Sequence, residues 1–152
     1  MATLTPTLTL ASTDIFVDQP LNLTVTDSLT VQAPMTDISK MATNDDIGNG
    51  AGIIIPTTTD VHYVYIKHTG ILASDGTTAC NSTTDYIVLG DADGESAADQ
   101  DGAGIMIRLY PGEFAFFPLD ANSASIGGGD GGLKMYAGSA NVQVNYAFYK
   151  RS

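Results

Sequence analysis

The chain has 152 residues, of which 43% are hydrophobic and 15% are charged. This length and composition fit one folded domain and exclude an intrinsically disordered chain. Seventeen Asp and Glu residues against six Lys and Arg residues give a formal net charge of −11, which repels a phosphate backbone. We therefore expect no nucleic-acid partner.

The first six residues, Met1 to Pro6, have neither a positively charged leader nor a continuous apolar stretch. No segment approaches the length of a membrane span, so we expect synthesis in a cytoplasm and no membrane partner. The single cysteine, Cys80, cannot form an intramolecular disulfide and lacks the neighbours of a metal site. It is interpreted as a small structural residue and not as a reactive thiol.

Apolar and polar residues alternate near the N-terminus, which is the pattern of half-buried strands. One predicted strand, residues 21–31, puts these apolar residues on one face: Leu21, Leu23, Val25, Leu29 and Val31. That face is expected to lie in the core, and the opposite face is expected to be exposed to solvent. Residues 3–10 alternate similarly but contain Pro6, which suits an edge strand or an arm that reaches a neighbour.

The middle of the chain contains several shorter predicted strands. Residues 34–43 are ambiguous between a short helical turn and an irregular strand. Strands are predicted at Gly52–Ile55, at Val61–Lys67 and at Tyr86–Leu89. Because both faces of Val61–Lys67 are apolar, this strand is predicted to be central.

The last third contains the strongest strand patterns. Ile105–Tyr110 and Glu113–Leu119 are joined by Pro111 and Gly112, the pair favoured at the centre of a type II turn, which predicts a tight bend or a hairpin. After a glycine-rich tip, Leu133–Ala137 and Val142–Tyr149 form the closing pair of strands. Roughly eight to ten short strands predict an all-β fold, a single β-sandwich or jelly-roll-like domain. We expect this domain over residues 21–152 and an extended N-terminal arm over residues 1–20.

Catalytic chemistry has little support in the sequence. The two histidines, His62 and His68, are six residues apart on or just after one strand. At roughly 3.3 Å per residue they lie ~20 Å apart on the same side, too far for one site. The motifs of serine hydrolases, zinc proteases and phosphate-binding loops are absent from the sequence. We expect no enzyme, no catalytic residue and no cofactor.

An acidic loop offers the best candidate for a bound ion. Asp91, Asp93 and Glu95, followed by Asp99 and Asp101, supply the carboxylates that hard cations require. The glycine and glutamate spacing differs from that of an EF-hand. We expect a solvated acidic loop without metal, and a calcium site at Asp91, Asp93 and Glu95 is the alternative.

Aromatic residues lie mostly on predicted strands, and most of them are expected in the core. Adjacent pairs point to opposite faces of a strand, so one face is left for a partner. The interface candidates are Tyr110, Phe116, Phe117, Phe148 and Tyr149. A sugar-binding platform would use the same residues, but the chain has no tryptophan.

Three segments resemble small virion proteins of tailed phages: Val64–Gly70, Leu109–Leu119 and Val144–Tyr149. In those proteins a strand reading roughly tyrosine-x-isoleucine-lysine-asparagine precedes a proline-glycine-glutamate turn and a tyrosine-rich final strand. The resemblance covers about residues 60 to 150. His68 departs from it by standing where asparagine is commoner, and no catalytic residue is carried over.

The resemblance implies a capsid decoration or cement protein that stabilises the phage head by bridging capsid subunits. The implied partners are the major capsid protein or other virion proteins, together with further copies of the chain, with a trimer favoured. The acidic charge favours the capsid exterior over the DNA-lined interior. The alternatives are a tail, head-fibre or adaptor component of the virion and, from another class, a carbohydrate-binding module.

Overall fold

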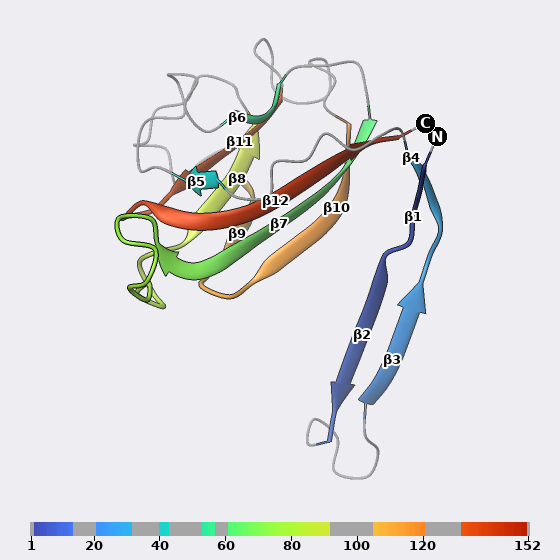
Figure 1. Ribbon diagram of the computed structural model, residues 1–152, viewed down its shortest axis with the longest axis horizontal. Coiled ribbons are helices and arrows are strands. Elements are labelled where there is room, and N and C mark those ends of the chain that lie inside the picture. The colour runs from blue at the N-terminus through green and yellow to red at the C-terminus, as the bar shows by residue number, and fades with distance from the viewer. Residues whose placement is uncertain are drawn as a thin grey trace.

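The computed structural model describes residues 2–13, 21–31, 40–42, 53–56, 61–91, 105–120 and 132–151. No residue in these ranges is helical, and every strand pairing among them is antiparallel. The predicted all-β fold class is confirmed. The strands, labelled in Figure 1, are β1 (Ala2–Leu4), β2 (Thr7–Ser12), β3 (Leu21–Thr26), β4 (Leu29–Val31), β5 (Lys40–Ala42), β6 (Ile53–Pro56), β7 (Val61–Leu72), β8 (Ile87–Asp91), β9 (Ile105–Leu109), β10 (Phe114–Asp120), β11 (Gly132–Ala137) and β12 (Val142–Lys150).

Two four-stranded sheets form the main body. Their strand orders are β10-β7-β12-β5 and β6-β11-β8-β9. β7 pairs with β10 on one side and with β12 on the other, so the predicted central position of this strand is confirmed. Of the ambiguous segment 34–43, residues 40–42 form β5, which pairs with β12.

The two sheets share one hydrophobic core. Along β12, residues 142, 144, 146 and 148 are buried and alternate with half-buried residues, as the period of two predicts. Val64 and Ile66 of β7 pack in the same cluster as Leu89 of β8 and Leu133 of β11. Each of these four side chains is fully buried, so the hydrophobic effect, at about 25 cal/mol per Å² of apolar area, holds the sheets together.

The turn at Pro111 and Gly112 carries the chain from one sheet to the other. Glu113 N–H donates to the Tyr110 carbonyl at 2.9 Å, and Gly112 has a φ of +90°, as a type II turn requires. β9 pairs with β8 whereas β10 pairs with β7, so the tight bend is correct and the hairpin alternative is wrong. Hydrogen bonds from Gly112 N–H to the His68 carbonyl and from His68 N–H to the Glu113 carbonyl fix the turn on β7.

The closing strands also lie in different sheets. β11 pairs with β6 and β8, and β12 pairs with β5 and β7. They follow each other in the sequence but do not pair with each other. Both sheets therefore depend on contacts between segments far apart in the chain.

Residues 2–13 and 21–31 pair as the two arms of a long hairpin. β1 pairs with β4, and β2 pairs with β3 from Thr7↔Thr26 to Ser12↔Leu21. Both strands are interrupted at the same level, at residues 5–6 and 27–28, where Asp27 N–H donates to the Pro6 carbonyl at 3.2 Å. In Figure 1 the β2–β3 part extends past β10 and away from the two sheets. The pairing joins residues on both sides of the boundary predicted at residue 20.

The apolar face of this hairpin is not core, which corrects the sequence-based expectation. Val31 is buried, with 2% exposed, but Leu23 and Val25 are 43% and 50% exposed. The alternation was predicted correctly and the burial was not. The reason is that β2 and β3 form a two-stranded ribbon, whereas Val31 at the base bridges to Arg151 beside the main body.

Candidate interaction surface

Four aromatic side chains line the outer face of β7 and β10, the face turned away from the core. Phe114 and Phe116 are 56% and 39% exposed. Phe116 stacks on Tyr63 with ring centroids 6.3 Å apart and planes at 11°, and Phe114 lies against Tyr65 at 6.3 Å and 38°. We call Tyr63, Tyr65, Phe114 and Phe116 the aromatic face. Ring pairs of this kind fix the side chains, so the surface is preformed.

The hairpin presents a second apolar surface. Leu8 lies opposite Val25 and Leu10 lies opposite Leu23 in the β2–β3 ladder. Residues separated by two along a strand point to the same side, so these four side chains share one face. Each is between 43% and 50% exposed. We call Leu8, Leu10, Leu23 and Val25 the apolar hairpin face.

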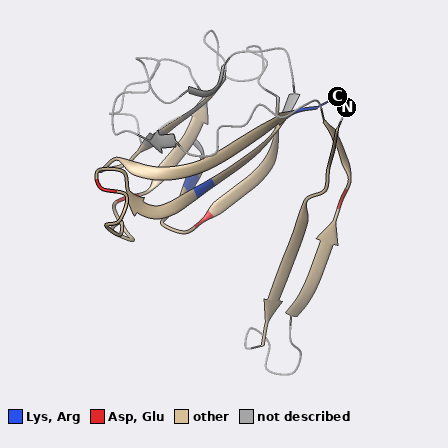
Figure 2. Cartoon of the chain, in the orientation of Figure 1, with Lys and Arg blue, Asp and Glu red and all other residues tan. Residues whose placement is uncertain are grey.

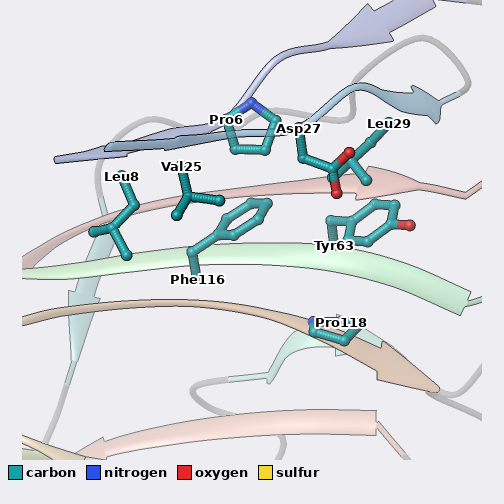
Figure 3. A pocket seen from close by; sticks show the side chains of 8 residues that line it. All are labelled: Pro6, Leu8, Val25, Asp27, Leu29, Tyr63, Phe116 and Pro118. Atoms are coloured by element: carbon teal, nitrogen blue, oxygen red, sulfur yellow. The ribbon is translucent and has the colours of Figure 1, made fainter. Parts of the chain in front are cut away.

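A cavity of about 260 Å³ separates part of these two surfaces. Its lining residues are Pro6, Leu8, Val25, Asp27 and Leu29 from the hairpin and Tyr63, Phe116 and Pro118 from the sheet. Figure 3 shows Leu8 and Val25 on the hairpin side of this space and Phe116 opposite them. Among these described residues only Asp27 is charged, so the cavity suits apolar side chains.

The two surfaces lie on segments with different charges. Residues 2–31 contain Asp14, Asp18 and Asp27 and no Lys, Arg or Glu. β7 contains Lys67 and no Asp or Glu, whereas β10 contains Asp120, directly follows Glu113 and has no Lys or Arg. In Figure 2 the hairpin carries a red segment, β7 carries a blue segment and a red segment lies at the start of β10. The hairpin is therefore acidic, and the strands of the aromatic face carry both signs of charge.

His68 is a buried structural residue. Its side chain has no exposed surface, and its Nδ1 accepts a hydrogen bond from Gly70 N–H at 3.0 Å. The proton of the ring therefore lies on Nε2, which donates to the Asp85 carbonyl at 2.7 Å. Burial lowers the pKa of His68, which keeps the imidazole neutral. Both ring nitrogens thus bind backbone groups, which leaves neither for a substrate.

Asp85 continues this network with its carboxylate. It accepts hydrogen bonds from the Ser139 hydroxyl at 2.6 Å, from Asn81 N–H at 2.7 Å and from the Thr84 hydroxyl at 3.2 Å. These bonds, led by that from Ser139, lower the pKa of Asp85. A hydrolytic triad needs the imidazole between serine and carboxylate, whereas here Ser139 binds the carboxylate directly. The network joins β7 to the turns before β8 and after β11 and has no catalytic geometry.

The predicted interface residues fall into different environments. Phe148 is 9% exposed and stacks on Tyr146 in the core, and Phe117 packs against the same core. Phe116 belongs to the aromatic face, and half-buried Tyr149 lies opposite Tyr63 in the β12–β7 ladder. Within each adjacent pair one ring therefore faces the core and the other faces outward, as strand alternation requires.

Tyr110 lies apart from the aromatic face. It is 36% exposed and meets Tyr86 edge to face, with centroids 5.9 Å apart, next to the type II turn. Tyr86 also lies under the Arg108 guanidinium, whose central carbon is 4.4 Å from the ring centroid. This small cluster fixes the turn and the end of β9.

Sequence patterns alone did not select Phe114, Tyr63, Tyr65 or the apolar hairpin face as interface residues. Alternation showed that the hairpin residues share a side, but it could not show that their own chain leaves that side open. A signal was present in the run from Phe114 to Phe117, which carries aromatics on both strand faces. This run indicated that β10 has an outward aromatic surface, but it could not show that Tyr63 and Tyr65 of β7 belong to the same surface.

The candidate ion site cannot be placed as a unit. Asp91 is the last residue of β8, and Asp93 and Glu95 lie outside the described residues, as does the glycine-rich stretch 127–131. Within the described ranges no three His, Cys, Asp or Glu side chains lie close enough together to hold a metal ion. Cys80 is half-buried against the core, and burial raises the pKa of its thiol. The described part of the chain contains no helix that is long and apolar enough to cross a membrane.

Comparison with known proteins identifies no relative: no family model, no curated protein and no solved structure matches the chain.

Proposed function

We propose that this chain is a virion structural protein of a tailed phage, a capsid decoration or cement protein that stabilises the head by bridging capsid subunits. The observation that carries the proposal is the pair of exposed apolar surfaces on a chain whose core is complete without them. The aromatic face and the apolar hairpin face lie outside the buried cluster that the two sheets share. Exposed apolar patches of this kind mark protein-binding surfaces.

The arrangement of the resembling segments supports the phage class. Val64–Gly70 lies in β7, Leu109–Leu119 includes the type II turn and β10, and Val144–Tyr149 lies in β12. These three strands are neighbours in one sheet, in the order β10-β7-β12. The motifs are far apart in the sequence, yet their strands are neighbours and carry Tyr65, Phe114 and Phe116 of the aromatic face.

We also propose a finer description of the fold. The two four-stranded sheets form a β-sandwich of jelly-roll type, with the chain passing between sheets at β9–β10 and β11–β12. The N-terminal hairpin is the arm that reaches a neighbouring subunit. An arm with an apolar face and a compact body with an aromatic face suit a protein that bridges other subunits.

The mechanism is thermodynamic. A protein that binds the assembled shell and not its dissociated subunits stabilises the shell by mass action, by about 2.7 kcal/mol per site at a hundredfold excess over Kd. The net charge of −11 suits the outer surface, away from the packaged DNA. No bond is made or broken in this function.

The test is co-sedimentation of the purified full chain with capsid shells from its own phage, before and after expansion. We expect binding to expanded shells and a higher melting temperature of those shells. Unexpanded shells are the matched control, because they contain the same capsid protein in another arrangement. Absence of binding to both shells would contradict the proposal. Binding to isolated tails would favour the tail alternative, and a saturable change of tyrosine fluorescence with sugars would favour a carbohydrate-binding module.

A further inference from the structure

We propose that the cavity between the hairpin and the aromatic face binds an arginine side chain that a partner protein presents. The inference deepens the proposed function and rests on it, because the partner that presents this side chain is a subunit of the capsid. Three features of the cavity lead to this assignment: its size, the single charge on its wall and the rings that line it.

The cavity has room for one long side chain. Its volume of about 260 Å³ is roughly nine times the ~30 Å³ that a water molecule occupies in the liquid. Pockets for small-molecule ligands are larger, at roughly 300–1,000 Å³. Seven of the eight lining residues are apolar or aromatic. These walls fit the methylene stem of a long side chain, because such stems bury well against apolar surface.

The one charge on the wall selects what the side chain ends in. Among the described residues that line the cavity, only Asp27 is charged, and in Figure 3 its oxygens point toward the ring of Tyr63. Asp27 Oδ1 accepts a hydrogen bond from Ser28 N–H at 2.7 Å, and no basic side chain of the described residues pairs with it. Hydrogen bonds between ionised groups are roughly twice as strong as neutral ones, so this carboxylate favours a cation.

The segments around the cavity are acidic as well. Residues 2–31, which supply the hairpin wall, contain three Asp and no basic residue. β10, which supplies two residues of the opposite wall, directly follows Glu113, ends at Asp120 and contains no Lys or Arg. Acid on both sides attracts a positive side chain and repels a negative one.

The basic residues of the chain itself lie outside the cavity. Lys67 lies opposite Phe114 in the β7–β10 ladder, and neither of them lines the cavity. Arg151 bridges to Val31 at the base of the hairpin and is exposed. No Lys or Arg is among the described lining residues, so the cation is supplied by another molecule.

The rings favour arginine over lysine. Tyr63 and Phe116 have planes only 11° apart, so they present surfaces of the same orientation. A planar guanidinium stacks on such surfaces, and it is less strongly hydrated than an ammonium group, so it enters an apolar space more easily. The chain contains one contact of this kind already, since the Arg108 guanidinium carbon lies 4.4 Å from the centroid of Tyr86.

The first experiment titrates the full chain with N-acetyl-arginine amide, without capsid shells, and follows the ring signals of Tyr63 and Phe116 by NMR. N-acetyl-citrulline amide is the control ligand, because it has the same shape without the charge. We expect saturable shifts with a Kd on the order of 1 mM for the arginine compound, and binding about 10-fold weaker for citrulline. Equal affinities for the two compounds, or no shift with either, would overturn the proposal.

Two matched variants test the carboxylate. Asp27→Asn keeps an acceptor for Ser28 N–H and removes the charge from the wall. Asp75→Asn removes the same charge from an exposed turn that does not line the cavity, where asparagine still accepts from Thr77 N–H. We expect Asp27→Asn to raise the Kd for arginine amide roughly fivefold or more, and Asp75→Asn to leave it unchanged. An equal Kd in both variants contradicts the role of Asp27.

A third variant, Phe116→Leu, keeps the wall apolar and removes one ring. Protons of an arginine stacked on the rings should shift upfield in the wild type, and this shift should decrease in the variant. An unchanged upfield shift would show that the arginine binds elsewhere on the protein.

Co-sedimentation of the same proteins with expanded shells then tests the source of the arginine. Asp27→Asn should bind shells more weakly than Asp75→Asn does. Equal shell binding by the two variants would remove the arginine contact and leave the proposed function standing. A wild type that binds arginine amide but no shells would instead remove the proposed function, and with it the capsid subunit as the partner.

Discussion

At the scale of single residues, burial decides what His68 does. The sequence predicted a structural or solvent-exposed histidine, and the structure places its ring inside, with both nitrogens bound to backbone groups of Gly70 and Asp85. A protonated ring could no longer accept the hydrogen bond of Gly70. The folded state therefore prefers the neutral imidazole, and His68 makes the stability of the fold depend on pH.

We predict that the protein loses stability as the pH falls below about 6.5, the usual pKa of histidine. Burial lowers the folded-state pKa of His68, so the unfolded chain binds the proton more tightly. The stabilisation is complete above the unfolded pKa and decreases as the pH falls from there towards the folded pKa. Urea unfolding of the wild type and of His68→Gln, at several pH values, checks this.

His68→Gln is expected to be less stable at neutral pH and to lose the slope between pH 6.5 and the lower folded pKa. Asp85 does not affect the comparison of the two slopes. Its pKa is lowered from 3.8, so its contribution to stability is lost only in more acidic solution. Equal slopes for both proteins in the histidine range would show that another group is responsible.

Gly112 is the second residue whose role can be tested by itself. Its φ of +90° favours glycine, and an added Cβ would meet nothing within 4 Å. The cost of Gly112→Ala is therefore conformational, and we predict a loss of about 1–2 kcal/mol in the free energy of unfolding. Gly112→Asn should lose less, since asparagine tolerates a positive φ better than alanine does. Equal losses in chemical denaturation would indicate a steric cause instead.

At the scale of elements, β7 and the β2–β3 hairpin differ most in how many strands they pair with and how much of their surface is buried. β7 is paired on both sides and buries Val64 and Ile66 completely, whereas β2 and β3 pair only with each other. Local stability follows the number of partners and the apolar area that each element buries. The two elements should therefore open at very different rates.

We predict that, in dilute solution, the amides of β2 and β3 exchange with deuterium much faster than those of β7. Hydrogen exchange of the full chain measures this difference, with β7 as the internal control. Equal protection of hairpin and β7 in dilute protein would mean that the hairpin is already covered.

At the scale of the whole molecule, the fold shows how a chain with a complete core can still carry exposed apolar surfaces. The shared cluster of the two sheets contains buried residues from β7, β8, β9, β10, β11 and β12 and none from the hairpin. The hairpin therefore adds surface and not core. This division is what favours a protein whose partners are other proteins, and the test with capsid shells belongs to this scale.

Part of the candidate surface could be predicted. The double aromatic pairs at Phe116–Phe117 and Phe148–Tyr149 predicted one outward ring each, and Phe116 and Tyr149 are those rings. Phe114 and the apolar hairpin face could not be selected in this way. Their exposure depends on what lies opposite, and that is a property of segments distant in the sequence.

The sequence by itself determined the all-β class, the positions of most strands, the central place of β7 and the type II turn at Gly112. These depend on local chemistry, namely the period of two in a strand and the φ that each residue tolerates. Tertiary structure alone decided that β9 and β10 lie in different sheets and that Leu23 and Val25 stay exposed. Alternation fixes which side chains share a face, whereas only the packing of distant strands decides whether that face is covered.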